Sequence, residues 1–215
     1  MSVFTDNVDA QIKILEDRLI DIEVRYIGPH TNPLASPSSY ALDVQSYALL
    51  CHAAFEEFAE RLSLEMVNHI EESFSLHRQI SKATLCFLYF NFGKGPISVD
   101  DWNQRDRLFD HIKEELRNRK SKISEYAMVN NHGVNIKYLQ HLFLPLGLDL
   151  PIGNEKNSLE QLARLRGFYA HAHSTTFPNA VNVVAPQMAV NFVMDVLDYM
   201  NSVAEKLKTM SFYLW

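Results

Sequence analysis

The stretch YALLCHAAFEEF, residues 47–58, is apolar around almost the whole circumference of a helix. A helix with so little polar surface lies at the centre of a core. Helical periodicity extends from about Tyr40 to Ile70. The sequence therefore predicts one long central helix on which the other helices pack.

Amphipathic helices are predicted at both ends of the chain. Between Asp6 and about Ile27, apolar residues recur every three or four positions, which is typical of a helix with one buried face. Three prolines in residues 28–39 end this helix and predict a surface loop. The last helix should have Pro186 in its first turn and run to about Met210. Its predicted buried stripe consists of Met188, Phe192, Val196, Tyr199 and Val203.

Two more helical segments are expected after the central helix. The first covers about residues 71–92, although its apolar run at residues 85–92 is also compatible with a strand. The second is capped by Asp100 or Asp101 and ends in a basic cluster near residue 120. Ser121 or Ser124 is then expected to cap a short continuation.

Two helices are predicted between this continuation and the last helix. A short one covers residues 134–144 and is closed by a proline and a glycine. The other begins with the spacing of a capping box, SLEQ at residues 158–161, and should fray near residue 174.

These segments predict an all-α fold, a helical bundle in a single domain. A chain of 215 residues, 47% hydrophobic and 21% charged, is long enough to bury one core. Residues 1–39 supply an N-terminal helix and a proline-rich loop, and residues 40–215 supply the main helical domain. We expect both parts to form one compact unit.

Composition limits the classes of function. A net charge of −6 excludes a protein that binds nucleic acid through an overall basic surface, so any polyanion site must be local. Cys51 and Cys86 both lie in apolar runs, as buried reduced thiols do. No segment has the apolar length of a membrane span or the pattern of a leader peptide. These features predict a soluble, cytoplasmic protein with no membrane partner.

One local basic cluster is present. Arg117, Arg119, Lys120 and Lys122 place four cations in six residues. They are candidates for contact with RNA phosphates. The alternative is a solvated helix end whose cations interact favourably with the helix dipole. The sequence leaves both interpretations open.

The stretch LRGFYAHAH, residues 165–173, combines one cation with two imidazoles. On a helix, Arg166 and His171 are about 140° out of phase, and Arg166 and His173 lie about 10 Å apart along the axis. One chain alone therefore makes a poor catalytic pair. A second copy across a two-fold axis would bring two guanidinium groups and at least two imidazoles together. We therefore expect a homodimer.

This residue set suits cleavage of a phosphodiester by the neighbouring ribose 2′-hydroxyl. An imidazole with a pKa near its usual value of about 6.5 exchanges protons at neutral pH, and an arginine holds the phosphate by bidentate hydrogen bonds. Such a site acts on RNA and not on DNA. No metal or cofactor is expected, since His171 and His173 splay by about 200° and no H-E-x-x-H spacing occurs. The alternative is a helix end with a surface arginine and two histidines at its rim.

The central helix carries a second group of polar residues. His52 and Glu56 are four positions apart and therefore share a helical face. They could orient the arginine and histidine from an adjacent helix. They could equally form an ordinary histidine–carboxylate pair at the edge of the helix.

These residues also resemble a known family. Residues 166–171, Arg-Gly-Phe-Tyr-Ala-His, match the R-x4-H pattern of HEPN domains. The order of features is similar too: the alanine-rich helix at residues 52–58, the segment at 135–148, the motif helix and a long final helix. Over roughly residues 40–210, the chain resembles HEPN families of the RiboL-PSP and related prokaryotic types.

The resemblance implies a homodimeric all-α bundle with metal-independent endoribonuclease activity that leaves a 2′,3′-cyclic phosphate. It implies that Arg166 contacts the scissile phosphate and that His171 serves in proton transfer, with His173 as an auxiliary residue. Such proteins often belong to toxin–antitoxin or phage-defence systems, so an antitoxin or defence protein is an expected partner. Supporting roles would fall to Glu56, His52 and Tyr169.

Two departures from the family pattern favour an alternative function. Gly167 follows the motif arginine, where active members commonly have asparagine or another polar residue. His173 occupies the position of the tyrosine in the R-x4-H-x-Y variant. The alternative is a catalytically inactive HEPN scaffold that binds a partner protein or a nucleotide.

Overall fold

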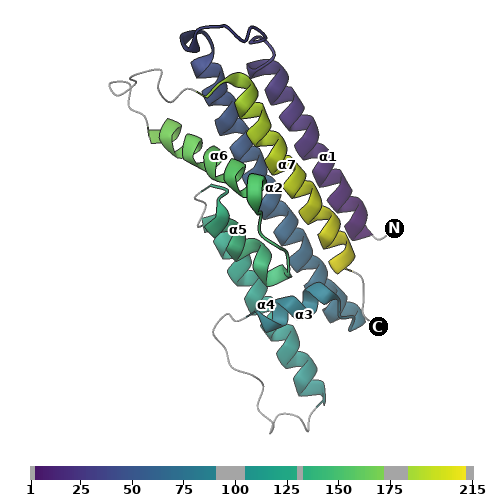
Figure 1. The fold of residues 1–215 in the computed structure, drawn as a ribbon. Helices are drawn as coiled ribbons and strands as arrows, with labels where there is room; N and C mark the ends of the chain where they lie inside the picture. The colour runs from purple at the N-terminus through teal and green to yellow at the C-terminus, as the bar shows by residue number, and fades with distance from the viewer. Residues whose placement is uncertain (1–2, 91–104, 130–132, 172–183, 212–215) are drawn as a thin grey trace.

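The computed structural model describes residues 3–90, 105–129, 133–171 and 184–211. In these ranges the chain is all-α, as predicted, and its helices form one elongated bundle (Figure 1). The elements are α1 (Val3–Tyr26), α2 (Pro37–His77), α3 (Lys82–Tyr89), α4 (Arg105–Val129), α5 (Ile136–Phe143), the 3₁₀ turn η2 (Leu144–Leu146), α6 (Gly153–His171) and α7 (Pro186–Met210).

Helix α2 is the centre of the bundle, which confirms the prediction drawn from residues 47–58. It packs against α1, α4, α5, α6 and α7. Its large side chains Tyr47, Phe55 and Leu62 are completely buried. Figure 1 shows α1, α2 and α7 side by side as long rods, with α6 crossing obliquely and α3, α4 and α5 gathered toward the far end of α2. The site discussed below lies where α2 meets α5 and α6.

The boundary between α2 and α3 differs from the prediction. The expected break near Ile70 is wrong, because α2 continues to His77 with Ser73 and Phe74 buried. The helix ends where Arg78 adopts the left-handed region, with φ 54°, and its N–H bonds back to the Phe74 carbonyl. Ser81 then starts α3 with a capping box. Residues 82–89 are helical, so the strand alternative is wrong for this part of the apolar run.

Helix α4 is also longer than predicted. It runs without a break from Arg105 to Val129, so the expected new helix starts at Ser121 or Ser124 are wrong. Leu116, Ile123 and Ala127 are buried along this length. Their spacing continues one helical stripe through both serines, and burial of the stripe stabilises the helix more than a serine cap would stabilise a break. The predicted starts at Asp100 and Asp101 lie outside the described residues.

Helix α6 begins earlier than the capping-box spacing at residues 158–161 predicts. Its first residue is Gly153, with φ 57°, so the prediction of a start at Ser158 is wrong. Ser158 does not cap the helix; its hydroxyl donates to the Asp195 carboxylate of α7 at 2.6 Å. This bond joins α6, which carries the motif arginine, to α7. The predicted fraying near residue 174 lies outside the described residues.

Helix α7 begins at Pro186 and ends at Met210, as predicted. Val196, Tyr199 and Val203 are buried in agreement with the expected stripe, and Phe192 packs partly buried against the core. Met188 is an exception, because its side chain is 51% exposed. The buried face of α7 instead starts one residue later, at Ala189.

Candidate functional site

Helix α2 presents a row of polar side chains toward α5 and α6. His52, Glu56 and Glu60 follow one another at four-residue steps and therefore lie along one face. His52 is 1% exposed and Glu56 is 8% exposed. Such groups are stable in a core only when their polar atoms find partners. The partners come from the segment that precedes α5.

His52 is hydrogen bonded to that segment. Its Nε2 donates to the Val134 carbonyl at 3.0 Å. Burial lowers the pKa of His52 to about 4; the bond to Val134 opposes this shift, and the positive charge of Arg166 adds to it. His52 is therefore neutral at neutral pH and anchors the loop, which indicates a positioning role and not proton exchange.

Gly133 lies between the polar row and Arg166. Its N–H donates to Oε1 of Glu56 at 2.8 Å. A Cβ at this position would lie 2.6 Å from Cε1 of His52 and 3.5 Å from Cζ of Arg166. The backbone also has φ 85°, in the left-handed region that glycine adopts most easily. Gly133 thus lets the chain pass within contact distance of both side chains.

Arg166 is carried to this point by α6. Arg166 is partly exposed as a residue, and its Cζ would lie 3.5 Å from a Cβ built on Gly133, so the guanidinium lies beside the Gly133 segment. The fold therefore brings Arg166 together with His52 and, through Gly133, with Glu56. The supporting role expected for His52 and Glu56 stays a prediction, because their observed bonds go to Val134 and Gly133. The guanidinium of a partly exposed arginine can bind a phosphate.

The other residues of the predicted site are described less fully. Helix α6 includes Tyr169 and ends at His171, so the motif positions from Arg166 to His171 are on one helix. The side chains of Tyr169 and His171, and all of His173, lie outside the described residues. Among the residues that are described, no group of three or more His, Cys, Asp or Glu side chains could hold a metal ion.

The basic cluster on α4 is paired with its surroundings. Arg117 and Lys120 both bind the carboxylate of Glu71, at 3.3 and 2.6 Å. Arg119 is 8% exposed and donates to the carbonyls of Phe87 and Phe90 at the end of α3. Lys122 is exposed on the next turn. The four cations therefore do not form one continuous basic surface, and Arg119 in particular stabilises the contact between α3 and α4.

Sequence reasoning missed Gly133 and its neighbours. Residues 130–133, Asn-Asn-His-Gly, have only the composition of a turn. One signal was present: Asn135 precedes a short apolar helix, and its side chain caps α5 by accepting from the Tyr138 N–H at 2.9 Å. That cap holds the residues just before α5 in a defined position at the start of the helix. Nothing in the sequence showed that the turn would meet Arg166.

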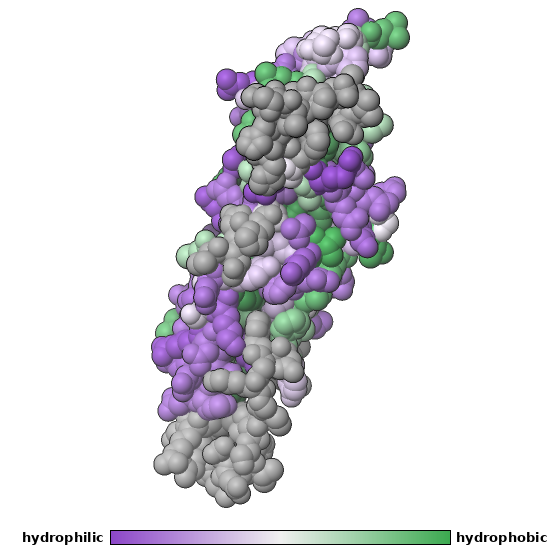
Figure 2. Space-filling view, turned by 90° about the vertical axis from the view of Figure 1, so that its left-hand side faces the viewer, coloured by the Kyte–Doolittle hydropathy of each residue, from purple (hydrophilic) through white to green (hydrophobic). Residues whose placement is uncertain are grey.

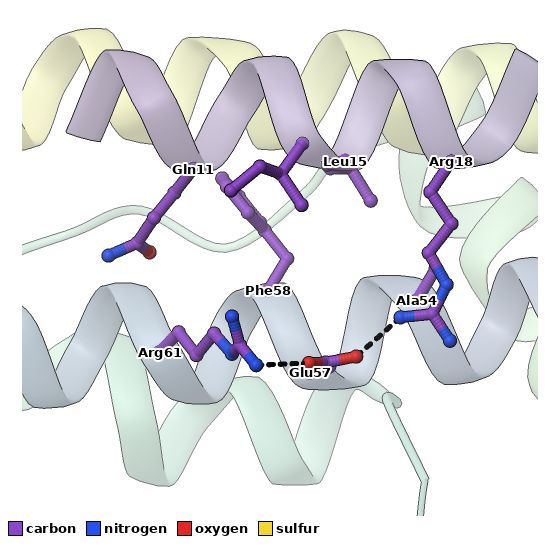
Figure 3. A pocket seen from close by; sticks show the side chains of 8 residues that line it. Gln11, Leu15, Arg18, Ala54, Glu57, Phe58 and Arg61 are labelled. Atoms are coloured by element: carbon purple, nitrogen blue, oxygen red, sulfur yellow. Dashed lines mark hydrogen bonds and ion pairs between the residues drawn. The ribbon is translucent and has the colours of Figure 1, made fainter. Parts of the chain in front are cut away.

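A separate groove lies on the opposite side of α2. Figure 3 shows it between α1 and α2, where Glu57 forms ion pairs with Arg18 and Arg61. Its cavity volume is about 40 Å³, which has room for a few water molecules but not for a small-molecule substrate. Glu57 and Arg61 point away from the row of His52 and Glu56 by helical phase. The groove is therefore distinct from the site at Arg166.

Replacing Gly133 with alanine tests whether the close approach matters. We expect a loss of about 1–3 kcal/mol in the free energy of unfolding from the backbone conformation alone, with a further loss from the contact with His52. Gly167→Ala is the matched control, because Gly167 is helical and an added Cβ meets no atom within 4 Å. It should gain up to about 1 kcal/mol. Chemical denaturation of both variants measures the difference; a Gly133→Ala protein as stable as the wild type would contradict this description.

Among the described residues, no helix is both long and apolar enough to cross a membrane. Neither a curated protein nor a solved structure matches the chain. Residues 15–209 match the family described as RiboL-PSP-HEPN. This match covers most of the chain, including α2, the Gly133 segment and the arginine-bearing helix α6. The chain belongs to the RiboL-PSP-HEPN family.

Proposed function

We propose that this protein is a dimeric, metal-independent endoribonuclease. The observation that carries the proposal is the position of Arg166, whose guanidinium lies against Gly133 beside a buried, neutral His52. Family membership supports it, since HEPN domains are often ribonucleases. A toxin–antitoxin or phage-defence role, with a partner protein that controls the activity, belongs to the same proposal.

The reaction is an attack by the ribose 2′-hydroxyl on the adjacent phosphate. Arg166 binds the phosphate oxygens and stabilises the charge that develops on them. His171 takes the proton of the attacking 2′-hydroxyl and returns it to the departing 5′-oxygen, and His173 assists. The P–O5′ bond breaks and a 2′,3′-cyclic phosphate remains. Gly133, His52 and Glu56 hold the surface against which Arg166 lies.

The proposed site needs two chains, because positions 166 and 171 of one helix are about 140° out of phase. Arg166→Ala and His171→Ala homodimers should each cut RNA at least about 100-fold more slowly than the wild type. When the two variants are co-expressed with different tags and the mixed dimer is purified, one intact arginine and one intact histidine face each other, and RNA cleavage should return. Activity that stays absent from the mixed dimer, or a protein that is monomeric in solution, would contradict the shared site.

A catalytically inactive scaffold is the second candidate, and Gly167 is the observation that favours it. The position after Arg166 carries no side chain, and the space beside it is open. Such a protein would use the Arg166 surface to bind a nucleotide or a partner. The two candidates differ in one measurement: the scaffold binds RNA or a nucleotide but leaves RNA uncut at any enzyme concentration.

A further inference from the structure

Two aromatic rings stack at the surface between α4 and α5. The rings of Tyr126 and His141 lie 4.5 Å apart between centroids and are almost parallel, at 13°. His141 is exposed and Tyr126 is partly exposed. Tyr126 also stacks on Tyr138, at 5.5 Å and 27°, and Tyr138 is buried. The three rings form a ladder that leads from the core to an exposed imidazole.

The ladder is held rigidly at both ends. The Tyr138 hydroxyl donates to Oε1 of Glu60 on α2 at 2.5 Å. Nδ1 of His141 donates to the Lys137 carbonyl at 2.7 Å, which fixes the orientation of the imidazole ring. Burial raises the pKa of Tyr126, so its ring is uncharged at neutral pH. A flat ring that is already fixed loses little conformational entropy when another ring stacks on it.

The ladder is connected to the Arg166 site by a short path. Asn135 caps α5 and also donates to the Gly133 carbonyl at 3.0 Å, so the start of α5 is tied to the segment that contacts Arg166. From Ile136 to His141 the helix rises by about 7.5 Å. His141 therefore lies about one and a half turns further along the same helix whose start is tied to the segment beside Arg166.

The surroundings of the ladder favour a polar, anionic ligand with flat rings. Lys122 precedes Tyr126 by four residues and Lys137 precedes His141 by four, so each ring has an exposed lysine on its own helical face. Glu125 is the exposed acidic neighbour on α4. Figure 2 views the molecule from the side on which α5 and α6 lie in Figure 1, and hydrophilic side chains gather over much of this face.

We infer that His141, backed by Tyr126, is the stacking platform for an unpaired base of the RNA bound at Arg166. Single-stranded nucleic acid is bound by this combination of exposed rings and nearby cations, and duplex RNA does not offer a free base face. The identity of the ligand as RNA rests on the proposed function. The platform residues lie on α4 and α5, outside the arginine and histidine motif.

Binding of a non-cleavable RNA tests the platform. The probe is a short single-stranded RNA with 2′-O-methyl ribose throughout, labelled with a fluorophore, and the same strand annealed to its complement is the comparison. His141→Ala should weaken binding of the single strand about tenfold. His141→Phe keeps a flat ring and should bind like the wild type. Gln140→Ala is the matched control, because Gln140 is the exposed neighbour on the same helix.

The outcomes separate the platform from the proposed activity. Equal affinity of His141→Ala and wild type, or tighter binding of the duplex, would overturn the platform even if the protein cuts RNA. Binding that depends on His141 in a protein that never cuts RNA would support the platform and reject the endoribonuclease. A wild-type protein that binds no RNA would reject both. Melting temperatures of all variants show whether a loss of binding comes from unfolding.

Discussion

Replacing Arg166 with alanine is expected to reduce RNA cleavage by about 100- to 1,000-fold, the usual cost of removing one preorganised donor from a phosphate or oxyanion. Arg166→Lys keeps the charge but loses the bidentate geometry, so its activity should fall between those of Arg166→Ala and the wild type. The measurement is the rate of cleavage of a defined single-stranded RNA under single-turnover conditions.

Arg18→Ala is the matched control for this prediction. Arg18 is an exposed arginine that pairs with Glu57 on the opposite side of α2. Its loss should leave the cleavage rate unchanged. An Arg166→Ala protein that cuts RNA as fast as Arg18→Ala would show that the activity does not depend on the Arg166 site.

The stability of the protein should fall as the pH is lowered from about 6.5 to 4, and His52 should be a major cause. The folded protein holds His52 neutral down to a pKa of about 4, whereas the imidazole of the unfolded chain binds a proton below about 6.5. In that window the unfolded state binds more protons, so acid favours unfolding. The contribution of His52 is about 3 kcal/mol at pH 4 and is absent at pH 7.5.

His52→Gln isolates this contribution. Glutamine can place a donor near the position of Nε2 and so replace the bond to the Val134 carbonyl, but it does not titrate. The pH dependence of its free energy of unfolding should be flatter than that of the wild type by about 3 kcal/mol at pH 4. His69, whose pKa is also lowered by burial, contributes in the same direction in both proteins and cancels in the comparison. Parallel curves for the two proteins would contradict a buried neutral His52.

Much of the fold could be predicted because periodicity reports burial directly. The central position of α2 and both ends of α7 followed from apolar spacing and one proline. The errors occurred where a local signal competed with packing. Ser158 has the sequence context of a cap but bonds to Asp195 on another helix, and no local pattern reveals a partner 37 residues away. Ser121 and Ser124 likewise remain inside α4 because the buried stripe continues past them.

The sequence identifies the residues of the site but not the contacts between them. His52 and Glu56 were recognised as one helical face, and Arg166 as the cation of a short motif. Their meeting depends on Gly133, whose positive φ and lack of a side chain allow the close approach. The sequence identifies a turn there but cannot tell which helices it touches. The ring pair of Tyr126 and His141 was missed for the same reason, since α4 and α5 approach each other only in the folded chain.

The most direct test of the central claim is the chemistry of the RNA ends. Purified wild-type protein is incubated with single-stranded RNA in excess EDTA, and the products are identified by mass spectrometry. The account predicts cleavage that resists the chelator, leaves a 2′,3′-cyclic phosphate and a 5′-hydroxyl, and is lost in Arg166→Ala. Cleavage that EDTA abolishes, or products with a 3′-hydroxyl and a 5′-phosphate, would contradict it.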